Sequence, residues 1–371
     1  MKITRNIAYG TIALVIVAII VILSYTDNFA GNQKGDGEKV KIGVIMPFSG
    51  ELAVFGDSAR QGIETALIQS GADKDSVEIL YEDTEGFSTQ GALSAFKKLV
   101  EQDNARIIIG PFGPAQVLTV APDTKKYGDL TIIGMSNCDD RFKEYASIFC
   151  IYPGIEEQVN FTLEKMQNAG LENVYLFTEQ SEFGLLVENI LQERQDTNFI
   201  GSEKVVAGQT KDFRTLIAKA VSKRPDVIYA MFAPNEGFVM LRQYPALSKD
   251  IPLYIGTDVT VEQLKGIFEN EAQNITFVAR ISEEYNADFS KLYMEMYEQN
   301  PDYFAALAHS VATIVLEALK EGFDYKILRS KMTGSAQEKT AIKNFYFKSD
   351  RTASMPLYNY AFKDRELKII E

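Results

Sequence analysis

Residues able to support covalent or acid–base catalysis are scarce in this chain. Its 371 residues include one histidine, His309, and two cysteines, Cys138 and Cys150. A Ser-His-Asp or Cys-His site would need His309, which lies in an apolar helical segment without a nucleophile motif beside it. The sequence also lacks a GxxxxGK[ST] phosphate-binding loop and the Cys/His spacing of a zinc site. We therefore expect no enzymatic activity, no metal site and no cofactor.

The two cysteines are candidates for a disulfide instead. Cys138 follows one predicted strand, and Cys150 lies in the next. If this domain is outside the cytoplasm, its compartment favours the bond, which would stabilise the fold by about 2–3 kcal/mol in the loop-entropy model. Two free thiols are the alternative.

One stretch near the start has the local pattern of a ligand-binding edge. Residues 41–48 form an apolar run that predicts a buried strand. Ser49-Gly50 and Phe55-Gly56 then have turn chemistry. Asp57-Ser58 are good N-caps for an amphipathic helix from Ala59 to about Ser70. In open α/β sheets, ligands bind where a strand's carboxyl end opens into such a loop and helix.

Strands and helices alternate along the rest of the chain in two series, which Pro153-Gly154 separates. This alternation predicts parallel sheets with helices on both faces. The predicted strands are 41–48, 78–83, 106–110, 130–135, 148–152, 174–178, one containing 205–206, 227–232, 253–256 and 275–281, with β-like segments at 343–347 and 357–370. The predicted helices are 59–70, 88–102, 114–126, 156–169, 183–195, 212–222, 235–244, 288–299 and 303–321.

The stretch 41–62 also resembles the first strand, loop and helix of the type I periplasmic-binding-protein fold, in particular the solute receptors for branched-chain amino acids. The similarity continues in the family's order and spacing through IIIGPFGPAQVLTVAP, LTIIGMSN, PDVIYAMFAPNEGFVMLRQ, LYIGTD and DYFAALAHSVATIVLEAL. It covers roughly Lys39 to the C-terminus.

This resemblance implies an α/β protein with two doubly wound, Rossmann-like lobes joined by a three-segment hinge. Lobe 1 would comprise 39–153 plus 279–335, and lobe 2 would comprise 154–278 plus 336–371. The chain would cross between the lobes near Pro153, near Val278 and between Gly334 and Lys343.

The resemblance also implies where lobe 1 would hold a ligand carboxylate. The family's serines after the third strand are replaced here by Gly113 and Pro114, so backbone N–H groups of Gly113, Ala115 and Gln116 would have to serve. A plain tight turn is the alternative. The family's other carboxylate-contacting segment corresponds to Ser136-Asn137-Cys138, where a disulfide would remove Cys138 as a donor.

Aromatic and acidic residues complete the implied site. Phe55 of lobe 1 and Phe183 and Phe232 of lobe 2 would form an apolar wall, with ordinary packing as the alternative for each. Asp258 would receive the α-ammonium group of an amino acid, because an ionised carboxylate is a natural acceptor for its three donors. The alternative is that Asp258 only caps a short helix.

The N-terminus and the net charge bear on location and partners. Lys2 and Arg5 precede the apolar run Ile7–Leu23, which approaches the length of a membrane-spanning helix. We expect residues 1–25 to form a cytoplasmic stub and a single-pass anchor and residues 26–38 a linker, with the binding domain outside; a cleaved signal peptide is the alternative.

The net charge of −13 argues against nucleic-acid binding.

The resemblance therefore implies an extracytoplasmic solute-binding protein. It would capture a small ligand, for which an amino acid is the first expectation, and deliver it to an ABC permease. A ligand-sensing receptor or regulatory domain of the same fold is the alternative. The absence of an output domain or second span after the fold favours transport.

Overall fold

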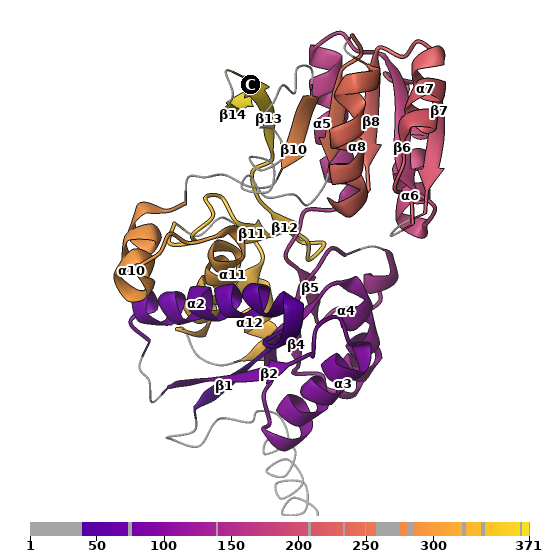
Figure 1. The fold of residues 1–371 in the computed structure, drawn as a ribbon. Coiled ribbons are helices and arrows are strands. Elements are labelled where there is room, and N and C mark those ends of the chain that lie inside the picture. Colours follow the sequence, from indigo (N-terminus) through magenta and orange to yellow (C-terminus); the bar gives the residue numbers. More distant parts are fainter. Residues whose placement is uncertain are drawn as a thin grey trace, which may run out of the picture. The chain divides into compact units, whose positions relative to one another are not determined.

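A computed structural model describes most of the chain from Lys39 onwards (Figure 1). The described residues form two large β-sheets and a separate two-stranded hairpin, with helices between the strands along the chain. They are residues 39–72, 76–138, 140–206, 209–232, 234–248, 250–256, 275–279, 285–320, 324–334, 338–363 and 366–370.

The first sheet has five strands, and its predicted parallel pairing is confirmed. The strands are β1 (Val40–Met46), β2 (Val77–Asp83), β3 (Ile107–Phe112), β4 (Thr131–Met135) and β5 (Ile148–Cys150). They follow the order β2-β1-β3-β4-β5. β1 pairs with β3, β3 with β4 and β4 with β5, all in parallel. Four of them, all except β2, are buried along most or all of their length, as expected for an apolar parallel sheet.

Six helices accompany this sheet. They are α2 (Ala53–Ser70), α3 (Thr89–Lys97), α4 (Pro114–Val120), α10 (Ala287–Tyr297), α11 (Tyr303–Leu319) and α12 (Tyr325–Met332). Ser88 caps α3, because its side chain accepts a hydrogen bond from the Gly91 amide. The α12 helix was not predicted; its Arg329 Nε donates to Thr131 Oγ1 of β4 at 3.0 Å.

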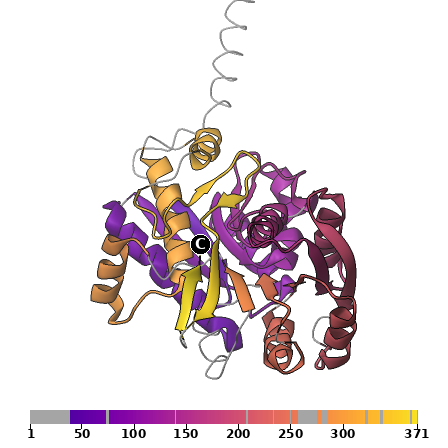
Figure 2. The same cartoon turned by 90° about the horizontal axis from the view of Figure 1, so that it is seen from above.

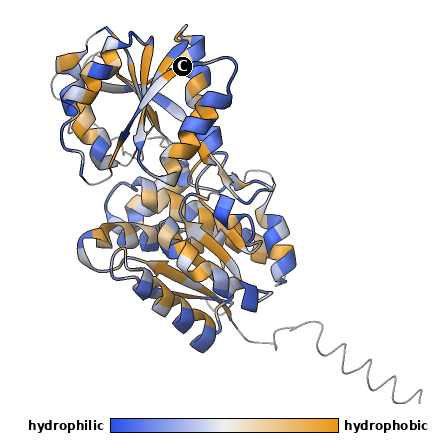
Figure 3. Cartoon of the chain, turned by 90° about the vertical axis from the view of Figure 1, so that its right-hand side faces the viewer, coloured by the Kyte–Doolittle hydropathy of each residue, from blue (hydrophilic) through white to orange (hydrophobic). Residues whose placement is uncertain are grey.

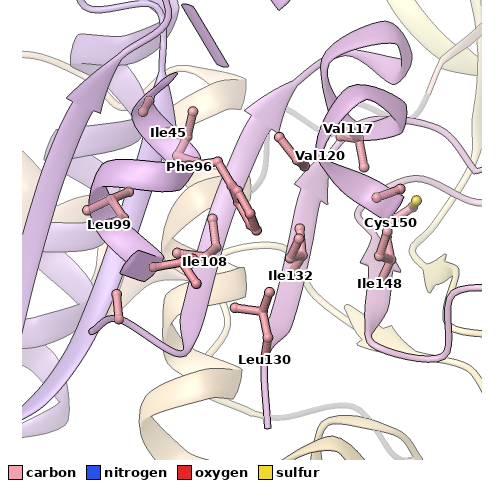
Figure 4. Packing of buried hydrophobic residues seen from close by; sticks show 14 of the residues in the cluster. Ile45, Phe96, Leu99, Ile108, Val117, Val120, Leu130, Ile132, Ile148 and Cys150 are labelled. Carbon is pink, nitrogen blue, oxygen red and sulfur yellow. The ribbon is translucent and has the colours of Figure 1, made fainter. Parts of the chain in front are cut away.

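The hydrophobic core of the first sheet lies between the strands and the helices α3 and α4 (Figure 4). Ile108 and Ile132 of neighbouring strands are fully buried beside Phe96 of α3 and Val117 of α4. Burying each large apolar side chain contributes about 1.5–3 kcal/mol, so this cluster holds the strands in the order that positions their carboxyl ends.

The start of α2 differs from the prediction. We expected a turn at Phe55-Gly56 and a helix from Ala59, but α2 already begins at Ala53. Gly56 is not in a turn; it lets α2 approach the backbone of Pro47 closely. A Cβ at this position would lie 2.2 Å from the Pro47 carbonyl oxygen. Ser58 is not a cap; its hydroxyl donates to Asp302 Oδ2 at 2.5 Å.

The second sheet has seven strands in the order β14-β13-β10-β9-β8-β6-β7. The strands are β6 (Asn173–Glu179), β7 (Asn198–Val205), β8 (Val227–Met231), β9 (Leu253–Gly256), β10 (Ile275–Ala279), β13 (Tyr358–Lys363) and β14 (Glu366–Ile370). Within this order, the five neighbouring strands β10, β9, β8, β6 and β7 pair in parallel. Figure 2 shows the last two strands, in yellow, beside β10, to which β13 pairs antiparallel.

Four helices accompany the second sheet: the first precedes β6, and the other three connect its strands. They are α5 (Ile155–Asn168), α6 (Glu182–Glu193), α7 (Arg214–Ser222) and α8 (Pro234–Leu247). Figure 3 shows the pattern that builds both sheets, with apolar colouring concentrated on the strands and polar colouring on the outer faces of the helices. This is the pattern of helices that cover a parallel sheet.

The predicted disulfide between Cys138 and Cys150 is present, with a Cα–Cα distance of 5.6 Å. It ties the loop after β4 to β5. The Cys150 amide in turn donates to the Arg351 carbonyl, next to the hairpin of β11 (Tyr346–Phe347) and β12 (Ala353–Ser354). Phe347 packs on Phe149 of β5 at 5.3 Å. We expected the chain to leave the first lobe between Gly334 and Lys343. Phe347 and Arg351, which follow that segment, still contact β5 of the first sheet.

No helix among the described residues is long and apolar enough to cross a membrane. The expected anchor, Ile7–Leu23, lies outside these residues.

Candidate functional site

The strand order of the first sheet identifies its binding edge. From β1 the chain continues to β2 on one side, whereas β3 lies on the other side of β1. This reversal is a topological switch point, where the loops after β1 and β3 diverge. Ligands of open α/β sheets bind at this position, outside the carboxyl ends of the strands.

Four phenyl rings gather at this point, and we call them the phenyl cluster: Phe55, Phe87, Phe112 and Phe304. Phe55 lies in the first turn of α2, Phe87 between β2 and α3, Phe112 at the end of β3 and Phe304 at the start of α11. The Phe112 ring lies 5.6 Å from that of Phe55 and 5.7 Å from that of Phe87. Phe304 packs 4.6 Å from Phe55 and 6.0 Å from Phe112.

Exposure within the phenyl cluster increases towards Phe87. Phe55, Phe112 and Phe304 are half-buried, whereas Phe87 is 64% exposed. Of these four residues, only Phe55 belongs to the predicted site. Phe112 and Phe304 lie in segments that carry the family resemblance but were not among the predicted site residues, and Phe87 lies outside those segments.

The loop between β3 and α4 offers fewer donors than expected. The Gly113 amide donates to the Met135 carbonyl at 3.0 Å, and Pro114 has no amide hydrogen. The Phe87 ring also lies close, since its Cε1 is 3.9 Å from the position of a Cβ on Gly113. Pro114 and Ala115 are exposed at the first turn of α4.

The side chain of Gln116 fixes this loop from inside. Gln116 is 1% exposed, and its Oε1 accepts a hydrogen bond from the Phe112 amide at 3.2 Å. Its Nε2 donates to the carbonyls of Gly86 at 3.0 Å and Ser88 at 3.2 Å, the residues on either side of Phe87. Gln116 therefore links the two loops that carry Phe112 and Phe87, a role that the sequence analysis, which considered only its backbone amide, did not predict.

The loop after β4 brings Ser136, Asn137 and Cys138 to the same edge, but two of these side chains are engaged. Ser136 is buried, and its hydroxyl donates to the Asn137 carbonyl at 2.8 Å. Cys138 is bonded to Cys150. Asn137 is half-buried.

A nearby acidic side chain supports the loops. Asp83, at the end of β2, accepts hydrogen bonds from the amides of Phe48 at 2.8 Å and Glu85 at 2.9 Å. Partial burial raises the pKa of Asp83, but these bonds and those from Ser49 outweigh it and hold the pKa below its usual value.

Two of the site residues predicted for the second lobe, Phe183 and Phe232, pack within that lobe. Phe183 is half-buried in the first turn of α6 and packs against the sheet's hydrophobic core. Phe232 is 3% exposed and packs 5.7 Å from Phe213, in agreement with the packing alternative. Asp258 lies outside the described residues.

Two α/β sheets, one with a binding edge at its switch point, define a ligand-binding protein of the two-lobe α/β class. Within that class, the chain belongs to the periplasmic binding protein family, whose model matches residues 39–366. Members of this family are extracytoplasmic substrate-binding proteins and not enzymes, and this chain is accordingly a solute-binding protein.

Known relatives agree with this assignment. The Leu/Ile/Val-binding protein BraC3 of Rhizobium johnstonii is 24% identical over 241 residues, which are 59% of this chain and 61% of that protein. The chain therefore matches about three fifths of that relative's length.

Two solved structures share the fold. The substrate-binding protein LivJ of a branched-chain amino acid transporter from Streptococcus pneumoniae, in complex with isoleucine, is 21% identical with a TM-score of 0.72, covering 90% of this chain and 99% of that one. A solute-binding protein of an ABC transporter from R. palustris, in complex with benzoate, is 19% identical with a TM-score of 0.70, covering 90% and 96%.

Proposed function

We propose that this protein captures a small organic acid, an amino acid or a related carboxylic acid, and delivers it to an ABC permease. The observation that carries the proposal is the family match over residues 39–366, joined to a switch-point edge that is lined by apolar rings. Its relatives support the ligand class, since they bind Leu, Ile or Val, isoleucine and benzoate according to their names.

Binding would work by closure of the two lobes around the ligand. Each lobe would contribute contacts, and the ligand would favour the closed state by the contacts that only this state allows. The division into lobes at Pro153, Val278 and the third crossing stays a prediction. So does the role of Asp258 as acceptor of a ligand ammonium group.

The apolar run Ile7–Leu23 would anchor the protein in the cell membrane, with the binding domain outside. Such an anchor would keep the receptor near its permease at a high effective concentration, so that delivery would not depend on free diffusion of the complex.

A thermal-shift screen of the full chain in mild detergent tests the ligand class. The panel contains the proteinogenic amino acids and small aliphatic and aromatic carboxylic acids, with glucose and ribose as neutral controls. A ligand at 100 times its Kd should stabilise the folded state by about 2.7 kcal/mol, which raises the melting temperature by several degrees. A panel in which no acid shifts the melting of the folded protein, or in which only a sugar does, contradicts the proposal.

A further inference from the structure

The phenyl cluster narrows the kind of ligand. We propose that the first sheet's binding edge holds a planar aromatic ring of the ligand, stacked on Phe87 as the next member of a row of phenyl rings. This inference rests on the proposed function and deepens it, because it assigns the ligand class within the small organic acids.

The geometry of the row is the first argument. Neighbouring rings of the row are nearly parallel. The interplanar angle is 19° between Phe55 and Phe112 and 23° between Phe112 and Phe87. The Phe112 ring is in the middle, with Phe304 tilted against it at 59°. Aromatic pairs favour offset stacking with centroids 4.5–7 Å apart, and both distances in the row lie within that range. Phe87 ends the row with 64% of its surface exposed, which leaves room for one more ring.

The rigid support of Phe87 is the second argument. Phe87 is exposed, and the one ring that it stacks on within the phenyl cluster is Phe112. Yet the buried side-chain amide of Gln116 donates to the carbonyls of Gly86 and Ser88, one on each side of Phe87. The Gly86 carbonyl also accepts from the Thr84 hydroxyl at 2.7 Å, and the Ser88 side chain caps α3. These bonds hold the backbone on both sides of Phe87, and a binding loop that is ordered beforehand lowers the entropy cost of binding.

The engagement of three polar groups at this edge is the third argument. The Gly113 amide, the Ser136 hydroxyl and the Gln116 side chain are all bonded within the protein. A charged group placed against the phenyl cluster would lose its hydration without gaining a partner from these three groups. The apolar ring of a ligand fits this edge, and the ligand's charged end then belongs elsewhere in the site.

Four ligands that form two matched pairs test the proposal by titration calorimetry on the full chain. Phenylalanine and 3-phenylpropionate carry the ring with and without the ammonium group; leucine and 4-methylpentanoate are their aliphatic counterparts. We expect each aromatic ligand to bind at least threefold more tightly than its counterpart. If the aliphatic ligands bind as tightly as their aromatic counterparts or more tightly, this inference is wrong and the proposed function is unaffected. Failure of all four, with every other acid of the screen, overturns the proposed function itself.

The variant Phe87→Leu tests the stacking directly, because it keeps an apolar side chain and removes the ring. We expect about three- to tenfold weaker binding of the aromatic ligands and little change for the aliphatic ones. Ile68→Ala is the matched control, since Ile68 is an exposed apolar residue of α2 outside the phenyl cluster (54% exposed). Unchanged affinity of Phe87→Leu for the aromatic ligands, or an equal loss in the control, overturns the inference.

Discussion

His309 is the only histidine of the chain and lies fully buried in α11. Its Nε2 lies 2.7 Å from Gln69 Oε1, its Nδ1 lies 3.4 Å from Thr313 Oγ1, and its ring packs 4.4 Å from Phe289. Burial lowers the pKa of His309 to about 3, because desolvation disfavours the charged imidazolium. These neutral surroundings fit a structural role for His309 within its apolar helix.

The buried imidazole makes stability depend on pH in a defined window. Between pH 6.5, the ordinary pKa, and about pH 3, the unfolded chain binds a proton at His309 that the folded chain does not. The free energy of unfolding therefore falls as the pH falls below 6.5, by about 1.4 kcal/mol between pH 7.5 and 5.5. Urea unfolding should show this loss in the wild type and its absence in His309→Gln. Equal losses in both proteins would show that His309 titrates alike in the two states.

Residue types at the binding edge were predictable from the sequence, but their hydrogen bonding was not. The resemblance to the family placed Phe55, Gly113 and Ser136 in the expected site. The bonds of Gln116 to Gly86 and Ser88 join positions 30 and 28 residues apart, and only the fold brings them together. No local pattern distinguishes an exposed Phe87 held by such bonds from an ordinary loop residue.

At the scale of elements, the contact between α2 and α11 sets the position of two rings of the phenyl cluster. The helices approach so closely at Gly62 that a Cβ there would lie 2.1 Å from the Ala305 carbonyl oxygen. Ala305 directly follows Phe304, whose ring packs on Phe55 of α2. Close helix contact therefore fixes part of the binding edge.

The variant Gly62→Ala should destabilise the protein, although alanine is the better helix former by up to about 1 kcal/mol. The added methyl group meets backbone, which cannot move aside as a side chain can, so the helices must separate. We expect a net loss of about 1–3 kcal/mol in chemical unfolding. Gly128→Ala is the control, because a Cβ there meets nothing within 4 Å, and it should change stability little. A Gly62→Ala protein as stable as the control would contradict the close contact.

Most strands and helices could be predicted from periodicity and caps, with errors where tertiary contacts decide. The strands β1 to β5 and the parallel pairing follow from apolar runs separated by amphipathic segments. The start of α2 was placed too late, because Gly56 reads as a turn residue while its real role is contact with Pro47. The β11–β12 hairpin was only partly foreseen, since each of its strands has two residues and too little pattern.

At the scale of the whole molecule, the ordered set of motifs predicted the family, which the match over residues 39–366 confirms. The predicted disulfide is also confirmed, and it joins the loop after β4 to the strand that contacts the Arg351 carbonyl. The ligand itself could not be predicted, because the family's polar contacts are replaced here by apolar side chains whose grouping depends on the fold.

The apolar run near the N-terminus makes a further prediction at this scale, which concerns membrane attachment. Lys2 and Arg5 favour a cytoplasmic N-terminus, and Ile7–Leu23 lacks the short apolar core and the small-residue cleavage site of a signal peptide. The full chain should remain in the membrane fraction after a high-salt wash and be released by detergent. A chain lacking residues 1–38 is the control and should be found in the soluble fraction. Mass spectrometry of the wild type should find an N-terminus at or near Met1; a soluble wild-type form that begins near Gly31 would instead establish cleavage.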